Sequence, residues 1–167
     1  AETPAYVYSQ YFLGRRATAL ARIDLLNKLS QNFDVTVYTH TDCIDILPTA
    51  IYGGKIDYYD TMPTVFQHSK INLNITLKTI QTGIPLRAWD ILGCGGFLLT
   101  NFQQELCDFF IPGEDFVYYE SPADAIEKAA YFLSHDRDRQ EIAHNAFEKI
   151  AASHTFHHRV QSMFDII

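Results

Sequence analysis

The sequence predicts an α/β protein of Rossmann-like fold, in which a parallel β-sheet carries helices on both faces. Short apolar and β-branched runs alternate with stretches of helical periodicity along the chain. The run Phe97-Leu98-Leu99 is apolar throughout, as expected for a strand covered on both faces. Cap residues such as Ser121 and Thr155 mark helix starts. The 167 residues suffice for a single domain, 1–167, with a sizeable core.

The first half of the chain alternates between the two kinds of structure. Tyr6-Val7-Tyr8 favours β-structure, so we expect an edge strand or a tail there. The elements expected after it are an amphipathic helix that follows Arg16 and ends near Ser30, a strand at 35–38, a short strand interrupted by Gly53-Gly54, a short helix from Met62 to near Ser69, and a strand at 71–77 with period-two alternation.

The central stretch, residues 81–100, is expected to form a loop, a short helix, a glycine turn and a buried strand. Pro85 suits the first helical position, and Cys94-Gly95-Gly96 ends the helix. Arg87 and Asp90 lie three positions apart and therefore share one face of that helix.

Two interpretations of this helix are open. Its first N–H groups, after the permissive Gly83 and beside Arg87, suit an anion, and Asp90 one turn later can accept hydrogen bonds from a sugar. Alternatively, it is an ordinary crossover helix with an Arg87–Asp90 pair on its surface. The spacing alone favours neither interpretation.

The remainder of the chain continues the alternation. The pattern predicts a short helix at 104–110, a strand at 116–119, and helices capped by Ser121, Asp136 and Thr155. The last helix carries an apolar stripe on one side, formed by Phe156, Val160, Met163, Phe164 and Ile167.

Charge limits the classes of partner. A net charge of −7 argues against nucleic acid, and it means that a phosphate ligand must be drawn by a local basic cluster. Lys70, Lys78 and Arg87 surround the strand at 71–77 and the next helix, where they would hold a diphosphate. The alternative is a set of solvated charges at strand ends.

Two asparagines are unexpected in a central parallel strand. Buried amides must be hydrogen-bonded, so Asn72 and Asn74 either tie down neighbouring loops, which is the commoner use, or reach a ligand. We include Asn74 among the candidate ligand-binding residues.

Other residue types point away from metal and membrane. Three cysteines without metal spacing indicate a reducing compartment, and no apolar run has the length of a membrane span, so we expect a cytoplasmic location. His157 and His158 are adjacent and diverge by about 100° on a helix. With His154 they are therefore expected to cap, pack or face solvent rather than to bind a metal ion.

Residues 70–75, 83–100 and 154–159 together resemble the CgeB-type, spore-protein glycosyltransferase family, whose members are similar to the group 1 glycosyltransferases of GT-B fold. The resemblance runs from about Tyr58 to the C-terminus. It implies two Rossmann-like domains that face each other across a cleft, with the acceptor bound by the N-terminal domain and the nucleotide-sugar donor by the C-terminal one. This chain is expected to be the C-terminal half of a longer protein.

The resemblance also implies roles for individual residues. Asp90 stands in the place of a glutamate that holds the ribose hydroxyls. A second family glutamate would fall at Thr82, where this sequence departs from the pattern. The diphosphate is expected to face Arg87 and the backbone of Gly83, Ile84 and Leu86.

The sequence therefore predicts the transfer of a sugar from a nucleotide-diphosphate donor to an unknown acceptor, with the leaving diphosphate stabilised by a helix N-terminus and basic side chains. No Asp-x-Asp motif is present, so neither a metal nor another cofactor is expected. The alternative is a non-catalytic Rossmann-like module with an interaction or structural role. Thr82 favours that alternative, whereas Arg87 and Asp90 favour the transferase.

Overall fold

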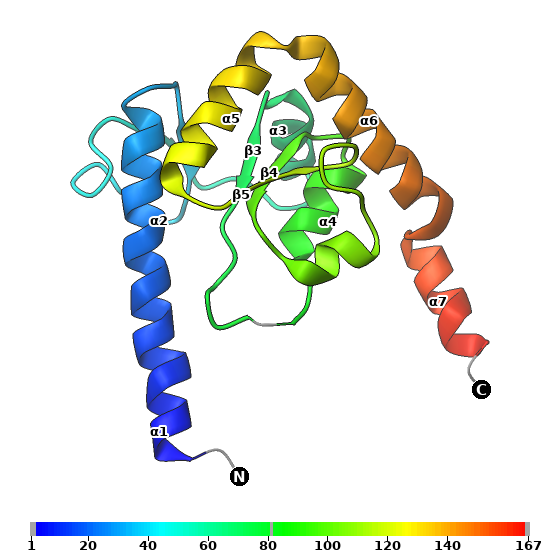
Figure 1. The fold of residues 1–167 in the computed structure, drawn as a ribbon, viewed down its shortest axis with the longest axis horizontal. Coiled ribbons are helices and arrows are strands. Elements are labelled where there is room, and N and C mark those ends of the chain that lie inside the picture. Colours follow the sequence, from blue (N-terminus) through cyan, green and yellow to red (C-terminus); the bar gives the residue numbers. More distant parts are fainter. Residues whose placement is uncertain (1–2, 81, 166–167) are drawn as a thin grey trace.

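The computed structural model describes residues 3–80 and 82–165. Figure 1 shows a central α/β body from which the helices near the two ends of the chain project. The elements in chain order are α1 (Pro4–Val7), η1 (Tyr8–Gly14), α2 (Arg15–Ser30), β1 (Thr36–Tyr38), β2 (Ile51–Gly54), α3 (Met62–His68), β3 (Asn72–Asn74), α4 (Leu86–Gly93), β4 (Leu98–Asn101), η2 (Gln104–Asp108), β5 (Val117–Tyr119), α5 (Pro122–Ser134), α6 (Asp136–Ser153) and α7 (Phe156–Phe164).

The N-terminal segment is helical, so the strand or tail expected at Tyr6-Val7-Tyr8 is wrong. The Thr3 hydroxyl accepts the Tyr6 N–H at 3.2 Å, and Pro4 takes the first helical position. These local start signals outweigh the β preference of tyrosine and valine. The helix continues through the π-helical η1 into α2, and the three form one rod (Figure 1).

All described strands pair in parallel, which confirms the α/β class. They form a two-stranded sheet, β1-β2, and a three-stranded sheet of order β3-β4-β5, with no pairing between the two in the described ranges. In the larger sheet Leu73 lies beside Leu99, and Thr100 beside Tyr118. The alternation expected over 71–77 yields only three strand residues, because the chain leaves the sheet after Asn74.

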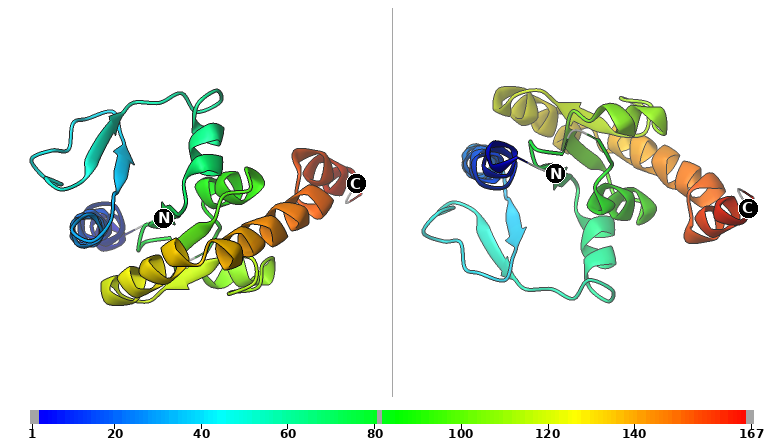
Figure 2. Two further views of the ribbon diagram at one scale, coloured as in Figure 1. Left: turned by 90° about the horizontal axis from the view of Figure 1, so that it is seen from above. Right: turned by 90° about the horizontal axis from the view of Figure 1, so that it is seen from below.

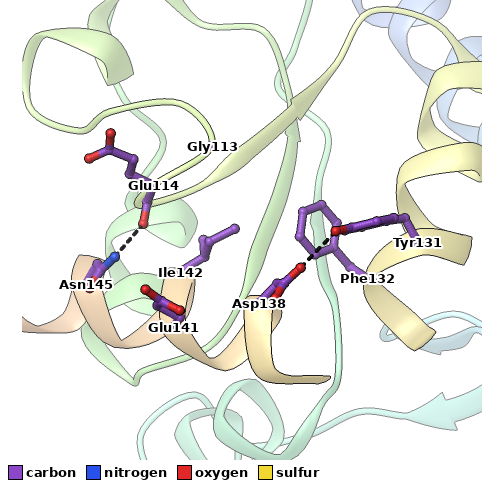
Figure 3. A pocket seen from close by; sticks show the side chains of 8 residues that line it. All are labelled: Gly113, Glu114, Tyr131, Phe132, Asp138, Glu141, Ile142 and Asn145. Atoms are coloured by element: carbon purple, nitrogen blue, oxygen red, sulfur yellow. Dashed lines mark hydrogen bonds between the residues drawn. The ribbon is translucent and has the colours of Figure 1, made fainter. Parts of the chain in front are cut away.

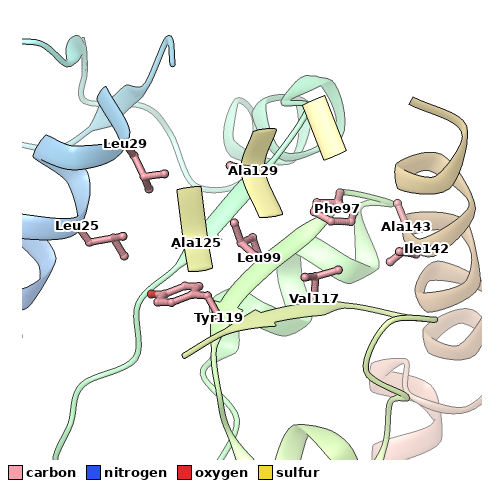
Figure 4. Close-up of a cluster of buried hydrophobic side chains, with 10 residues drawn as sticks. All are labelled: Leu25, Leu29, Phe97, Leu99, Val117, Tyr119, Ala125, Ala129, Ile142 and Ala143. Carbon is pink, nitrogen blue, oxygen red and sulfur yellow. The ribbon is translucent and has the colours of Figure 1, made fainter. Parts of the chain in front are cut away.

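Helices cover both faces of the three-stranded sheet, as the views of Figure 2 show. The first core lies between α2, α5, the start of α6 and one face of the sheet (Figure 4). The second core lies between α3, α4, η2 and the opposite face. In β4 and the residue before it, Phe97 and Leu99 face the first core while Leu98 faces the second, so this run is covered on both faces as expected.

The glycine turn between α4 and β4 brings two backbone segments close together. Gly95 has φ of +72°, a conformation that favours glycine. Gly96 packs so tightly that a Cβ there would lie 2.7 Å from the Asn72 amide nitrogen and 2.7 Å from the Phe66 carbonyl oxygen. At the other end of α4, Pro85 is the residue before the helix rather than its first residue.

The last helix differs from its expected packing. Thr155 and His158 form a capping box, as the sequence suggested for the helix start. The apolar stripe, however, faces solvent: the side chains of Phe156, Met163 and Phe164 are 91%, 67% and 68% exposed. None of the helices in the described ranges has the length and apolar character needed to cross a membrane.

The tight contact at Gly96 gives a testable consequence. Gly96→Ala should lower the free energy of unfolding by about 1–3 kcal/mol, because the added methyl group meets a backbone carbonyl that cannot move aside. Gly93→Ala is the matched control, since its Cβ would meet only the Ile150 side chain at 3.8 Å. Urea denaturation of the three proteins measures the difference, and equal stability of the two variants would contradict the packing described here.

Candidate functional site

The carboxyl edge of the three-stranded sheet is the place where a doubly wound α/β fold exposes its connecting loops. Residues 75–80 leave β3 at this edge, and residues 82–85 lead into α4. Phe102 follows β4, and Glu120 follows β5, at the same edge. The side chains that reach this edge form the candidate site.

Hydrogen bonds hold the segment after β3 against its neighbours. The Thr18 hydroxyl, on α2, accepts the Lys78 N–H at 3.0 Å. A guanidinium nitrogen of Arg22, one turn further along α2, donates to the Ile75 carbonyl oxygen at 3.1 Å. On the other side, the side-chain oxygen of Asn101 accepts the Thr76 N–H at 2.7 Å. The segment is thus tied to both α2 and the end of β4.

Two arginines, Arg22 and Arg87, reach this edge, and the charge of one acts on the other. Arg22 is half-buried, and both its burial and the charge of Arg87 lower the pKa of its guanidinium. Arg87 is the second residue of α4 and its side chain is exposed. Tyr119, at the end of β5, is buried, and this burial raises its pKa. The charge of Arg22 acts on Tyr119 in the opposite direction. The Lys78 side chain is exposed on the adjoining loop.

The loop before α4 presents backbone N–H groups at the same edge. Gly83 has φ of +101°, which an L side chain would strain. Its N–H is hydrogen-bonded to the carboxylate of Glu105, on η2. Ile84 is half-buried against the second core, and the Leu86 side chain is 77% exposed. This loop therefore already binds one anionic oxygen, although that oxygen belongs to the protein.

Asp90 is not paired with Arg87 in the described part of the chain. Its carboxylate accepts the Tyr58 hydroxyl at 2.5 Å instead. That hydrogen bond, some burial and the Asp90 charge raise the pKa of Tyr58. The bond uses Oδ2, and a carboxylate has further acceptor capacity at Oδ1. The surface ion pair considered as an alternative is therefore replaced by a tyrosine–aspartate contact.

Two other expected residues lie elsewhere. Lys70 precedes β3 at the amino end of the strand, near Asp136, whose pKa is lowered mainly by its ion pair with Arg139 and further by the Lys70 charge. Lys70 and Lys78 thus stand at opposite ends of β3. Asn74 is 2% exposed and donates to the hydroxyls of Thr76 and Thr100 at 3.1 and 3.0 Å, which is the structural use.

One hollow on the described surface lies at the opposite end of the sheet (Figure 3). It measures about 320 Å³, and Glu114, Asp138 and Glu141 give it an acidic lining. Such a lining repels phosphate, so size alone does not identify the donor site. A smaller hollow of about 160 Å³ lies at the carboxyl edge, between the N-terminal rod and the loop after β3.

The three C-terminal histidines behave as the sequence indicated. His154 packs against the rings of Trp89, Phe109 and Phe110, and His158 completes the capping box. The His157 side chain is exposed, and its ring lies edge-on to that of His158, with the ring centres 6.1 Å apart. Within the described ranges no three His, Cys, Asp or Glu side chains gather as a metal site would require.

Sequence reasoning missed three residues of this site. Arg22 stands on a helix far from the central stretch in sequence, and only the pairing of α2 with the loop after β3 brings it to the edge. Tyr58 and Glu105 reach Asp90 and Gly83 in the same way, through tertiary contacts. The spacing of Arg22 four positions after Thr18, on one helix face, was the only available signal.

Comparison with known families assigns the class of protein. A family model described as glycosyl transferase-like matches residues 16–165. The chain therefore belongs to the glycosyl transferase-like family, and this family suggests transferase activity. Comparison with curated proteins gave no significant match.

The environment of His154 predicts a pH dependence of stability. Its burial, with the charges of Arg159 and His158, lowers its pKa, so the unfolded chain binds a proton more readily than the folded one. Stability should therefore fall as the pH drops below about 6.5, the ordinary histidine value. His154→Gln should reduce this slope, whereas the exposed His157→Gln should leave it unchanged. Denaturation midpoints between pH 5 and 8 measure it, and identical slopes in both variants would refute the assignment.

Proposed function

We propose that the chain is the donor-binding domain of a GT-B glycosyltransferase of the CgeB type, and that it holds a nucleotide sugar at the carboxyl edge. One observation carries the proposal: Arg22, which donates to the Ile75 carbonyl oxygen, and Arg87, at the start of α4, reach this edge from helices on opposite faces of the sheet. Two like charges are stabilised by an anion between them, which in a protein of net charge −7 requires a local site. Membership of the glycosyl transferase-like family supplies the class of ligand, a sugar donor.

In this proposal the diphosphate lies between the two guanidinium groups and the start of α4. Arginine matches phosphate oxygens with paired N–H donors, and the helix N-terminus adds the backbone N–H groups near Ile84 and Leu86, while Glu105 holds the Gly83 N–H. Lys78 lies on the adjoining loop and contributes long-range attraction. These groups are in place before the bond to the sugar breaks, so they stabilise the charge that develops on the leaving diphosphate.

The ribose is assigned to Asp90. Its Oδ1 is the acceptor for the ribose hydroxyls, while Tyr58 holds Oδ2 and so restricts the rotation of the carboxylate. Asp90 lies one turn after Arg87 on α4, which suits a ribose directly attached to the diphosphate. Asn74 and Lys70 take no part, because one is buried in hydrogen bonds and the other lies at the amino end of β3.

The acceptor is assigned to another domain of the same full-length protein, as the resemblance to two-domain GT-B enzymes implies. Residues 1–167 alone should accordingly bind the donor without transferring its sugar. The same resemblance implies a catalytic cleft between the two domains.

The diphosphate assignment predicts unequal effects of three cations. Arg22→Met and Arg87→Met should each weaken a nucleoside diphosphate about ten- to a hundredfold, since each removes a charged hydrogen-bond donor. Lys70→Met, a cation removed from the opposite end of β3, should change the affinity less than about twofold. Titration calorimetry with UDP, GDP and dTDP measures the affinities, and melting curves establish that each variant is folded. Equal losses in all three variants would indicate a general charge effect and contradict the site.

The ribose assignment predicts a loss that depends on the sugar hydroxyls. Asp90→Ala should weaken a nucleoside diphosphate about tenfold to several hundredfold, and Asp90→Asn less, because the amide keeps one acceptor oxygen. The same variants should bind a 2′,3′-dideoxynucleoside diphosphate as the wild type does. If Asp90→Ala loses both ligands equally, the carboxylate supports the fold rather than the ribose.

Nucleoside diphosphate binding distinguishes the proposed function from the alternative, a non-catalytic module. The module is favoured by Thr82, where the family has a carboxylate, and it requires that no nucleoside diphosphate bind to the wild-type chain. A thermal-shift series that reaches millimolar ligand without any stabilisation would therefore support the module and overturn the donor-binding proposal.

A further inference from the structure

The smaller hollow is formed where the N-terminal rod passes the loop after β3. Figure 1 shows the rod extending beyond the sheet on the side of this loop. The two segments are in close contact, since a Cβ at Gly14 would lie 2.1 Å from the Thr79 side chain. The hollow is about 160 Å³ and is lined by Tyr6, Gln10, Tyr11, Arg15, Leu77 and Thr79.

Its lining combines aromatic faces with hydrogen-bonding groups. The Tyr6 and Tyr11 side chains are 47% and 48% exposed, so part of each ring is open to a ligand. The Gln10 amide and the Thr79 hydroxyl both donate and accept hydrogen bonds. The Arg15 guanidinium lies 5.5 Å from the centre of the Tyr11 ring. A pyranose ring, with an apolar C–H face and a rim of hydroxyls, has the matching chemistry.

The hollow lies further along α2 from Arg22, toward the start of that helix. Arg15, Thr18 and Arg22 follow at helical spacing on the face of α2 that meets the loop after β3. Arg15 and Arg22 are seven residues apart, about 10 Å along the helix. A ligand part that reaches from Arg22 along this face therefore enters the hollow.

The order of the chemical groups in a nucleotide sugar decides which group of the donor enters the hollow. The molecule runs from base to ribose, then to the diphosphate and the sugar. Asp90, assigned to the ribose, lies on α4 at the face of the second core, whereas α2 lies at the face of the first core. With the diphosphate between Arg87 and Arg22, the group that extends toward α2 is the sugar.

We propose that the hollow lined by Tyr6, Gln10, Tyr11 and Thr79 is the subsite for the sugar ring of the donor. The inference rests on the proposed function, because it takes its orientation from the diphosphate site. The Tyr11 ring packs against the apolar face of the sugar, while the Gln10 amide and the Thr79 hydroxyl hydrogen-bond its hydroxyls. Arg15 holds the Tyr11 ring from the helix side.

The test compares each nucleotide sugar with its own diphosphate: UDP-glucose and UDP-N-acetylglucosamine with UDP, GDP-mannose with GDP, and dTDP-glucose with dTDP. For the preferred pair, Tyr11→Ala should weaken the nucleotide sugar about three- to tenfold and change the diphosphate less than about twofold. Tyr8→Ala is the matched control, since Tyr8 is 59% exposed on the same rod but does not line the hollow. Calorimetry measures the affinities.

Two results would overturn the subsite: equal losses for the sugar and the diphosphate in Tyr11→Ala, or no loss for any pair. Saturation-transfer NMR with methyl glycosides tests it without a nucleotide. Saturation-transfer signals of the glycoside that vanish in Tyr11→Ala and persist in Tyr8→Ala support the subsite. Glycoside signals that Tyr11→Ala leaves unchanged count against it. Glycoside contact at Tyr11 without any diphosphate binding would sink the donor-binding proposal while retaining a sugar site.

Discussion

The segment after β3 is held between α2 and β4 by three hydrogen bonds, and the candidate site depends on them. Thr18 binds the Lys78 N–H, Arg22 binds the Ile75 carbonyl, and Asn101 binds the Thr76 N–H. These contacts fix the path by which the chain leaves the sheet after β3. They also use only part of the donor capacity of Arg22, a guanidinium with five N–H groups. The same bond that shapes the loop thus orients a cation at the edge.

The two ends of the sheet differ in the charge of their side chains. At the amino end, acidic side chains line the larger hollow, and Lys70 lies near the Asp136 carboxylate. At the carboxyl end, Arg22 and Arg87 lie close enough for one charge to lower the pKa of the other. In an acidic protein such a pair is unfavourable without an anion. The Glu105 carboxylate at the Gly83 N–H indicates that an anionic oxygen suits the adjoining backbone.

Local sequence signals were enough for the parts of the fold that local interactions determine. The helix before Ser30, the helix after Pro85 and the doubly covered run at Phe97 all follow from periodicity and composition. The β preference at Tyr6 failed because a cap and a proline outside that triplet start a helix. In the site, Arg87 and Asp90 could be predicted from the sequence, because their spacing places them on one face of α4. Arg22 was not, because its place at the edge results from tertiary packing.

The most direct test is to map the amide groups that respond to a nucleoside diphosphate. In ¹⁵N-resolved NMR spectra of the wild-type chain, added UDP, GDP or dTDP should shift most strongly the amide signals of residues 75–78, 83, 84, 86 and 87, because these backbone groups border the two arginines. Shifts concentrated around the acidic hollow at Glu114 and Asp138, or no shifts at all, would contradict a diphosphate site at the carboxyl edge.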